Sequence, residues 1–166
     1  MTKNSNVLVT KQQAVIVDLD GTLCDHRHRL HHICNKEGFR LAHPNWSAYN
    51  EALINDSVNE QVRVIAGLLK DAGRGIILLT GRMNEYWGIT LDWLILYEIR
   101  FDMLIMREDD DFRQDYLFKK DVYEQTIQDI YNVELVLEDK ESCVNMWKDA
   151  GLFVLQPRLK EVTCES

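Results

Sequence analysis

Five short apolar runs alternate along the chain with stretches of helical periodicity. The runs have the length and β-branched content of buried strands; they are Ala14–Asp20, Ile76–Leu79, Phe101–Met106, Val133–Leu137 and Leu152–Leu155. The helical stretches are Val58–Asp71, Tyr86–Ile99, Tyr116–Ile130 and Ser142–Ala150. Strands and helices that alternate in this way form right-handed βαβ units. The pattern therefore predicts an α/β fold, a three-layer Rossmann-like parallel sheet with helices on both faces.

Polar residues stand where each of the first four predicted strands ends. They are Asp18, Asp20, Thr80, Arg82, Arg107, Glu138 and Asp139. In a parallel α/β sheet the carboxyl ends of the strands lie along one edge, and ligands bind outside that edge. Acids, a hydroxyl and guanidinium groups are therefore predicted to meet at one site.

Residues 24–55 do not fit the repeating unit. Because they follow the first strand directly, they are predicted to form a small cap-like insertion over the edge of the sheet. The whole chain, 1–166, is otherwise predicted to be one domain, as its length allows.

The insertion opens with a histidine-rich run, His26–His32. Two imidazoles on one helical face could bind zinc, but no Cys or acid nearby completes a ligand set. A polar rim at the mouth of the site, together with Arg27 and Arg29, is the favoured interpretation. Trp46 and Tyr49 could stack on a nucleic-acid base or pack the insertion.

The segment Asp18-Leu-Asp20-Gly21-Thr22 has a specific chemical logic. At a strand end that turns through Gly21, both carboxylates can reach one site. A carboxylate that attacks a phosphoryl group needs a hard divalent cation to neutralise the charges that meet. The second acid can protonate the leaving oxygen and later deprotonate the attacking water.

With Thr80, Lys119 and the late acidic pair, this segment resembles the haloacid dehalogenase-like phosphatases. The resemblance implies a haloacid dehalogenase-like fold and a Mg²⁺ cofactor. It implies that Asp18 is the nucleophile, Asp20 the general acid and base, Thr80 a donor to the phosphoryl group, and Lys119 a partner of both. It further implies that Asp18, the backbone carbonyl of Asp20 and Asp139 bind Mg²⁺. Glu138 departs from the usual pattern, so its part in metal binding is left open.

A closer resemblance, from Val15 to Gln156, is to the 3′-phosphatase domain of phage polynucleotide kinase–phosphatases. The matching text includes Thr80-Gly-Arg82, Arg107, Arg113-x-Asp115-x3-Lys119 and Glu138-Asp-Lys-Glu-Ser-Cys-Val-Asn-Met-Trp147. It implies that Gly81, Arg82, Arg107 and Arg113 bind substrate phosphates, for which a guanidinium offers a planar fork. Ion pairs with Asp109–Asp111 or Asp115 are the alternative for the arginines. The chain has no Gly-x4-Gly-Lys-Ser/Thr kinase loop.

The implied activity is removal of the 3′-phosphate from DNA or RNA ends through an aspartyl-phosphate. A phosphatase of free nucleotides is the alternative, and a binding module without turnover is a third hypothesis. The net charge of −8 argues against a protein that tracks a long nucleic-acid backbone, but not against one that handles a single strand end.

No apolar run approaches the ~20 residues that a membrane span needs, and Met1–Asn6 does not look like a secretory signal. A cytoplasmic protein without a membrane partner is therefore expected. The apolar residues of Trp87–Tyr97 could form a dimer face or pack against the sheet, so a homo-oligomer is left open.

Overall fold

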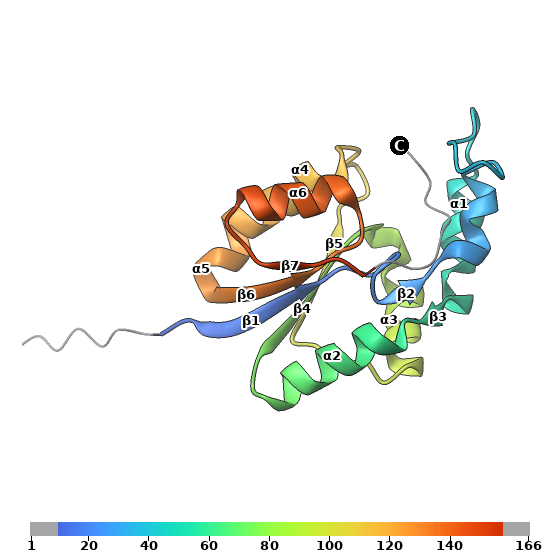
Figure 1. The fold of residues 1–166 in the computed structure, drawn as a ribbon. Helices are drawn as coiled ribbons and strands as arrows, with labels where there is room; N and C mark the ends of the chain where they lie inside the picture. The colour runs from blue at the N-terminus through green and yellow to red at the C-terminus, as the bar shows by residue number, and fades with distance from the viewer. Residues whose placement is uncertain (1–9, 158–166) are drawn as a thin grey trace, which may run out of the picture.

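A computed structural model describes residues 10–157. Residues 1–9 and 158–166, which the predicted domain 1–166 includes, lie outside the described part, as does the polar segment Met1–Asn6. Five strands form one parallel sheet in the order β5-β4-β1-β6-β7 (Figure 1). Their bounds are β1 Gln12–Val17, β4 Gly75–Met83, β5 Met103–Arg107, β6 Tyr131–Leu137 and β7 Val154–Leu155. The predicted α/β fold with a parallel sheet is confirmed.

Helices cover both faces of the sheet, with α2 and α3 on one side and α4 and α6 on the other (Figure 1). Their bounds are α2 Glu60–Asp71, α3 Trp87–Leu96, α4 Asp115–Val122, α5 Gln128–Ile130 and α6 Glu141–Asp149. A short 3₁₀ turn, Asn84–Tyr86, precedes α3.

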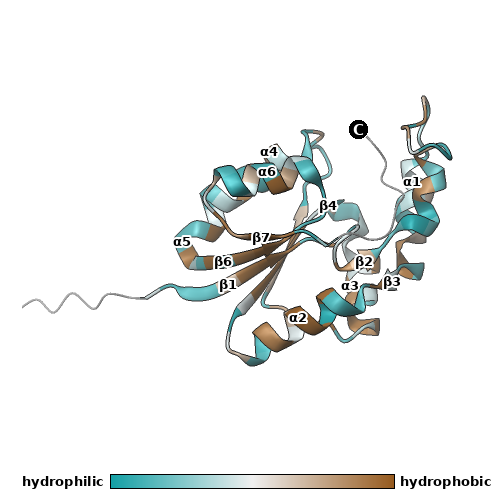
Figure 2. Ribbon diagram, viewed as in Figure 1, coloured by the Kyte–Doolittle hydropathy of each residue, from teal (hydrophilic) through white to brown (hydrophobic). Residues whose placement is uncertain are grey.

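The alternation of side chains along β1 explains the three layers. Val15 and Val17 belong to the core that includes Val62 of α2 and Trp93 of α3. Ala14 and Ile16 point the other way, into the core that includes Phe118 of α4 and Trp147 of α6. A strand buried on both faces must be apolar throughout, and the strands are largely brown in Figure 2, whereas the helices mix brown with teal.

The insertion has a frame and a small core of its own. Strand β2 (Cys24–Asp25) pairs antiparallel with β3 (Ser57–Val58). Between them lie a 3₁₀ helix (Arg27–His32), α1 (Trp46–Glu51) and a second 3₁₀ helix (Ala52–Asn55). Its buried residues Leu30, Ile33, Cys34 and Tyr49 form a cluster separate from the two cores of the sheet.

Two elements differ from the sequence-based expectation. Strand β4 continues to Met83 rather than ending at Leu79, although its pairing with β5 is interrupted between Leu79 and Met83. The stretch expected as one helix from Tyr116 to Ile130 is divided by a π turn, Tyr123–Ile127. Helical periodicity in the sequence does not reveal the π turn, because it reports which side chains share a face over a long window and not the hydrogen-bond partner of each residue.

Within residues 10–157, no helix combines the length and the apolar character that crossing a membrane requires.

Candidate active site

Asp18 follows the last residue of β1, at the edge where the strands end. Lys119, on α4, extends its ammonium group to this carboxylate, with 2.7 Å between Lys119 Nζ and Asp18 Oδ1. The same nitrogen lies 2.7 Å from Oε2 of Glu138, just past β6. All three residues are at least 95% buried, so water screens these charges poorly. One cation is therefore shared by two carboxylates that come from different strands.

Burial and neighbouring charges act in opposite directions here. Burial raises the pKa of Asp18 well above its usual range; Lys119 lowers it, while Glu138 and Asp139 raise it further. Burial alone would lower the pKa of Lys119, but Asp18 and Glu138 outweigh it and hold that pKa well above its usual range. The site therefore has more negative than positive charge, and a second cation would stabilise the ionised carboxylates.

Asp139 supplies the third acidic group at this point. Carboxylate oxygens of Asp18, Glu138 and Asp139 all lie within 4.8 Å of one another. Burial and Glu138 raise the pKa of Asp139 to about 7, and Thr22 Oγ1 donates a hydrogen bond to Asp139 Oδ1 at 3.2 Å. Three close oxygen donors with excess negative charge are the donor set of a hard divalent cation such as Mg²⁺. The described residues thus fit a metal of this kind.

Gly21 lets the loop after β1 approach Asp139. Its φ is +89°, and a Cβ at this position would lie 2.1 Å from Asp139 Oδ2. Only glycine combines this backbone conformation with so close an approach. The position of Asp139 therefore explains why glycine follows Asp20 in the sequence.

Glu138 has several protein partners. Besides Lys119, its Oε2 accepts from the Trp147 indole at 3.5 Å, and its Oε1 accepts from the backbone NH of Lys140 at 3.3 Å. Glu138 thus binds Lys119 and the turn into α6. Of the three acids, Asp18 and Asp139 have carboxylate oxygens with fewer hydrogen-bond partners in the protein.

Asp20 faces a different environment from Asp18. Arg82, on β4, forms a two-pronged pair with it, with Nη2 at 2.6 Å from Oδ1 and Nε at 3.0 Å from Oδ2. Arg29 of the insertion donates to the same Oδ1. Burial would raise the pKa of Asp20, but Arg29 and Arg82 hold it well below its usual range. The Asp20 carboxylate thus faces two arginines, and its backbone carbonyl is the group that the resemblance assigns to the metal.

Asp56 holds both arginines in place. Its side chain is completely buried; Arg29 binds it through Nε at 2.8 Å and Nη2 at 2.7 Å, and Arg82 Nη2 lies 3.3 Å away. His28 Nε2 lies 2.8 Å from Asp56 Oδ1. Sequence reasoning missed this acid, because it lies 27 residues from Arg29 and belongs to no motif.

The interpretation of Arg29 as part of a polar rim is wrong. Its side chain is fully buried, between Asp20 and Asp56.

The described residues contain two groups of three close side chains that could bind a metal. One is the acidic cluster of Asp18, Glu138 and Asp139, and the other is Asp20, Cys24 and Asp56. Neither group includes a histidine.

Arg107, at the end of β5, secures the loop that leads to α4. It pairs with Asp115, the first residue of α4, and donates to the carbonyl oxygens of Gly81 at 3.2 Å and Arg113 at 2.5 Å. A Cβ on Gly81 would lie 2.6 Å from Asp115 Oδ1, so glycine is required for this contact as well. The prediction that Arg107 and Gly81 bind substrate stays a prediction; in this structure they position α4, and with it Lys119.

Arg113 is nearly half exposed and lies on the rim. It pairs with Asp111, with Nη2 at 2.8 Å from Oδ2, and with Asp121. The pair with Asp111 is one that the sequence offered as the alternative role of this arginine, whereas the pair with Asp121 was not expected. Thr80 is buried on β4, where its Oγ1 accepts from the backbone NH of Arg82 at 3.3 Å. Since Leu78 pairs with Val17, Thr80 stands beside the chain that follows β1.

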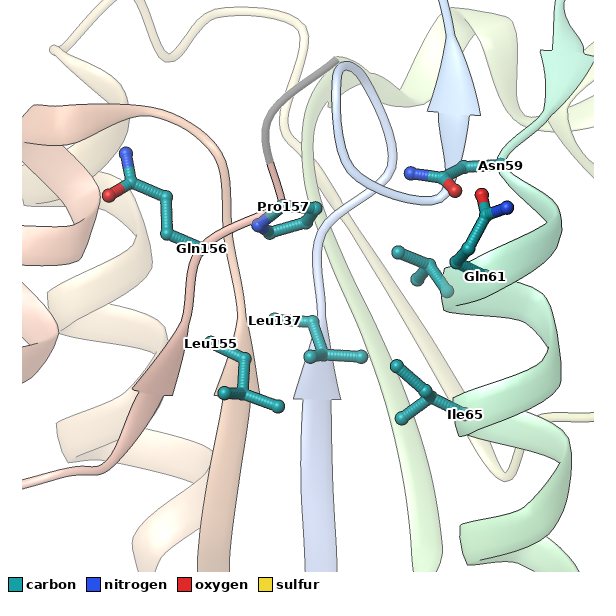
Figure 3. A pocket seen from close by; sticks show the side chains of 8 residues that line it. Asn59, Gln61, Ile65, Leu137, Leu155, Gln156 and Pro157 are labelled. Carbon is teal, nitrogen blue, oxygen red and sulfur yellow. The ribbon is translucent and has the colours of Figure 1, made fainter.

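An apolar pocket lies beside this centre, between α2 and the ends of β6 and β7 (Figure 3). Its lining residues are Asn59, Gln61, Val62, Ile65, Leu137, Leu155, Gln156 and Pro157. Asn59 donates to the carbonyl of Thr22 at 3.0 Å, and Gln156 donates to the carbonyl of Asp139 at 2.8 Å. None of the predicted site residues lines this pocket.

Comparison with known families decides how this centre is classified. The family model for the phosphatase domain of polynucleotide kinase PNKP matches residues 12–159, which include every predicted site residue. The chain belongs to the PNKP phosphatase-domain family. The predicted relation to haloacid dehalogenase-like phosphatases and polynucleotide kinase–phosphatases is thereby confirmed.

Solved structures agree with the PNKP assignment. A chain in a Pnkp1/Rnl/Hen1 complex is 30% identical, with a TM-score of 0.73 over 98% of this chain and 53% of that one. A chain in a Pnkp1/Rnl/Hen1 RNA repair complex is 33% identical, with a TM-score of 0.71 over 90% of this chain and 43% of that one. The class C acid phosphatase of Bacillus anthracis is 14% identical over 90% of this chain and 68% of that one, with a TM-score of 0.65, and shares the fold.

A curated relative comes from Autographa californica nuclear polyhedrosis virus and is named for polynucleotide kinase and RNA ligase activities. It is 35% identical over 75 residues, which are 45% of this chain and 11% of the viral protein. This chain thus spans about half or less of the PNKP-related proteins that it matches.

Proposed function

We propose that this phosphatase domain is a Mg²⁺-dependent phosphomonoesterase that removes the 3′-phosphate from polynucleotide ends. The observation that carries the chemistry is the buried Asp18–Lys119 pair, with Glu138 and Asp139 beside it. The proposal for the substrate rests on the family match and on the relatives that are named for polynucleotide and RNA repair.

The proposed reaction gives the two acids different roles. Asp18 attacks phosphorus, the bond from phosphorus to the 3′-oxygen breaks, and Asp20 donates a proton to the departing oxygen. Water then attacks the aspartyl-phosphate, Asp20 accepts its proton, and phosphate leaves with Asp18 restored. Lys119 offsets the negative charge on Asp18 and on the transferring group. Mg²⁺, when bound by Asp18, Asp139 and the backbone carbonyl of Asp20, would neutralise charge on the phosphate.

Arg29 and Arg82 hold the pKa of Asp20 below its usual range and so keep it as the carboxylate, the form that accepts a proton in the second step. To act as an acid in the first step it must be protonated, which becomes more frequent as the pH falls.

The test is phosphate release from a 3′-phosphorylated oligonucleotide, with Mg²⁺ or with EDTA, by wild type and Asp18→Asn. We expect release only by wild type with Mg²⁺. Nucleoside 3′- and 5′-monophosphates serve as competing substrates. A tenfold or greater preference for monophosphates would favour a nucleotide phosphatase, and release by Asp18→Asn would show that another residue is the nucleophile.

A further inference from the structure

The segment between β2 and β3 differs in charge from the rest of the molecule. From His26 to Asn45 it carries four Lys or Arg residues, one acid and all five histidines of the chain, although the net charge of the whole is −8. Arg29 is buried in ion pairs with Asp20 and Asp56, and Arg27 pairs with Asp25. Lys36 and Arg40 are the cations of this segment outside those pairs, and they can attract a polyanion locally.

Two large apolar side chains of this segment remain exposed. Phe39 is 58% and Trp46 is 44% exposed. The small core of the insertion is already formed by Leu30, Ile33, Cys34 and Tyr49, which are all buried. Packing of the insertion therefore does not account for the free surface of Trp46 and Phe39.

Local structure holds these side chains in position. The Asn45 side chain accepts a hydrogen bond from the backbone NH of Ala48 at 3.1 Å, and so caps α1 and orients Trp46, its first residue. The Asn35 side chain accepts from the backbone NH of Phe39 at 2.8 Å. The guanidinium of Arg40 lies over the Trp46 ring, 5.3 Å from its centroid. A cation and an aromatic face are thus presented together.

A chain of ring contacts connects Trp46 with the catalytic centre. The Trp46 and Tyr49 ring centroids are 5.7 Å apart, and the guanidinium of Arg29 lies 4.1 Å from the Tyr49 centroid. Arg29 itself pairs with Asp20. Because Asp20 protonates the departing 3′-oxygen, the nucleoside must lie on the Asp20 side of the phosphate. The strand then leaves the site towards the insertion.

We propose that Trp46 and Arg40 form a base-stacking and phosphate-contacting surface for the single-stranded nucleic acid whose 3′ end enters the active site. The inference rests on the proposed function. A base stacks on Trp46, and Arg40 contacts the phosphate next to it, in the manner of single-strand binders that combine aromatic faces with cations. Base stacking does not depend on the sugar, so this surface binds both DNA and RNA.

The test compares wild type with Trp46→Ala, Trp46→Phe and Arg40→Ala. Substrates are 3′-phosphorylated single strands of two, four and eight nucleotides, in DNA and RNA, and p-nitrophenyl phosphate, a small ester without a base. The control is Arg100→Ala, which removes an exposed arginine paired with Asp71, just before β5 and so at the opposite edge of the sheet. Binding of the octanucleotides is also measured with Asp18→Asn, alone and combined with each of the other substitutions. This affinity does not depend on turnover.

Stacking is worth about 1–3 kcal/mol per base, which corresponds to about 5- to 150-fold in affinity. We compare kcat/KM for the octanucleotide with kcat/KM for the small ester. For Trp46→Ala we expect this ratio to be about 5- to 150-fold lower than in wild type. Trp46→Phe should recover most of the loss. Arg40→Ala should reduce the slope of log affinity against log salt by about one, and Arg100→Ala should match wild type.

An unchanged ratio in Trp46→Ala and Arg40→Ala, with wild type active on oligonucleotides, would overturn this inference and leave the proposed function standing. An equal loss on the small ester and the octanucleotide would also overturn it, since it would show a structural role only. A loss confined to RNA would contradict stacking and point to the 2′-hydroxyl. No release from any oligonucleotide by wild type would overturn both proposals.

Discussion

At the scale of single residues, two adjacent lysines have different surroundings. Lys119 is buried against Asp18 and Glu138, whereas the side chain of Lys120 is half exposed and lies 3.8 Å from Glu124. Burial removes the competition of water, so the first pair is strong and the second contributes little. The two positions therefore form a matched pair for a substitution experiment.

Lys119→Ala should lower kcat for phosphate release by about 10² to 10³, the usual loss when one preorganised electrostatic group is removed. It should also lower the free energy of unfolding by about 3–5 kcal/mol, because two buried carboxylates lose their cation. Lys120→Ala should change kcat by less than twofold. Phosphate-release kinetics and urea unfolding measure the two effects. Equal effects of the two substitutions would show that Lys119 has no special part in the site.

Gly21→Ala should weaken metal binding, because the new Cβ would occupy the position of Asp139 Oδ2. We expect at least a tenfold higher Mg²⁺ concentration for half-maximal activity. The control is Gly151→Ala, where φ is +80° and a Cβ would meet nothing within 4 Å. Both substitutions carry the backbone cost of a positive φ, but only Gly21→Ala displaces Asp139. A similar Mg²⁺ requirement in both variants would contradict the steric explanation.

At the scale of elements, the loop between β5 and α4 determines where Lys119 stands. Arg107 binds the carbonyl of Gly81 on β4 and the side chain of Asp115 at the start of α4. Lys140, after β6, binds the same Asp115 at 2.7 Å. Asp115 is therefore the point where α4 is joined to two strands of the sheet.

Asp115→Ala should release the first turn of α4 and expose residues 108–115 to faster amide hydrogen exchange. Since Lys119 lies one turn further along, kcat should fall by tenfold or more while the sheet keeps its protection. Asp121→Ala is the control, because it removes only the exposed partner of Arg113 and should cost less than about 1 kcal/mol. Unchanged exchange in Asp115→Ala would mean that other contacts hold the loop.

At the scale of the whole molecule, the acidic cluster couples stability to pH and to metal. The pKa of Asp139 is about 7 in the folded protein, against about 3.9 when unfolded. The folded state thus holds this proton more tightly. Its contribution to stability is complete below about pH 4 and is lost as the pH rises through 7. The loss is on the order of a few kcal/mol.

A bound divalent cation should reverse this loss, because it favours the ionised carboxylates and binds only the folded state. Without divalent cations, the free energy of unfolding should therefore decrease between pH 5 and 8. The increase in melting temperature on adding Mg²⁺ should become larger over the same interval. Thermal unfolding at a series of pH values measures both trends. Asp139→Asn should weaken both trends and leave the part that Asp18 contributes. A Mg²⁺ effect that is constant with pH would contradict the assignment.

The α/β architecture can be predicted from the sequence pattern, because a strand buried on both faces must be apolar throughout and a helix on the sheet must be apolar on one side. It also placed Asp18, Thr80 and Asp139 at one edge, since the ends of parallel strands necessarily meet there. These features follow from local periodicity and from the geometry of a sheet.

Only the tertiary structure decided which charges meet. The network of Arg29, Asp56, Arg82 and Asp20 joins the insertion to β4, and no local pattern marks Asp56 or predicts that Arg29 is buried. Arg107 and Arg113 have partners that the sequence did offer, Asp115 and Asp111, whereas sequence spacing does not show that Arg82 pairs with Asp20 and Asp56. The physical reason is that ion pairs depend on distance and burial in space, whereas sequence periodicity reports only which side of an element a residue occupies.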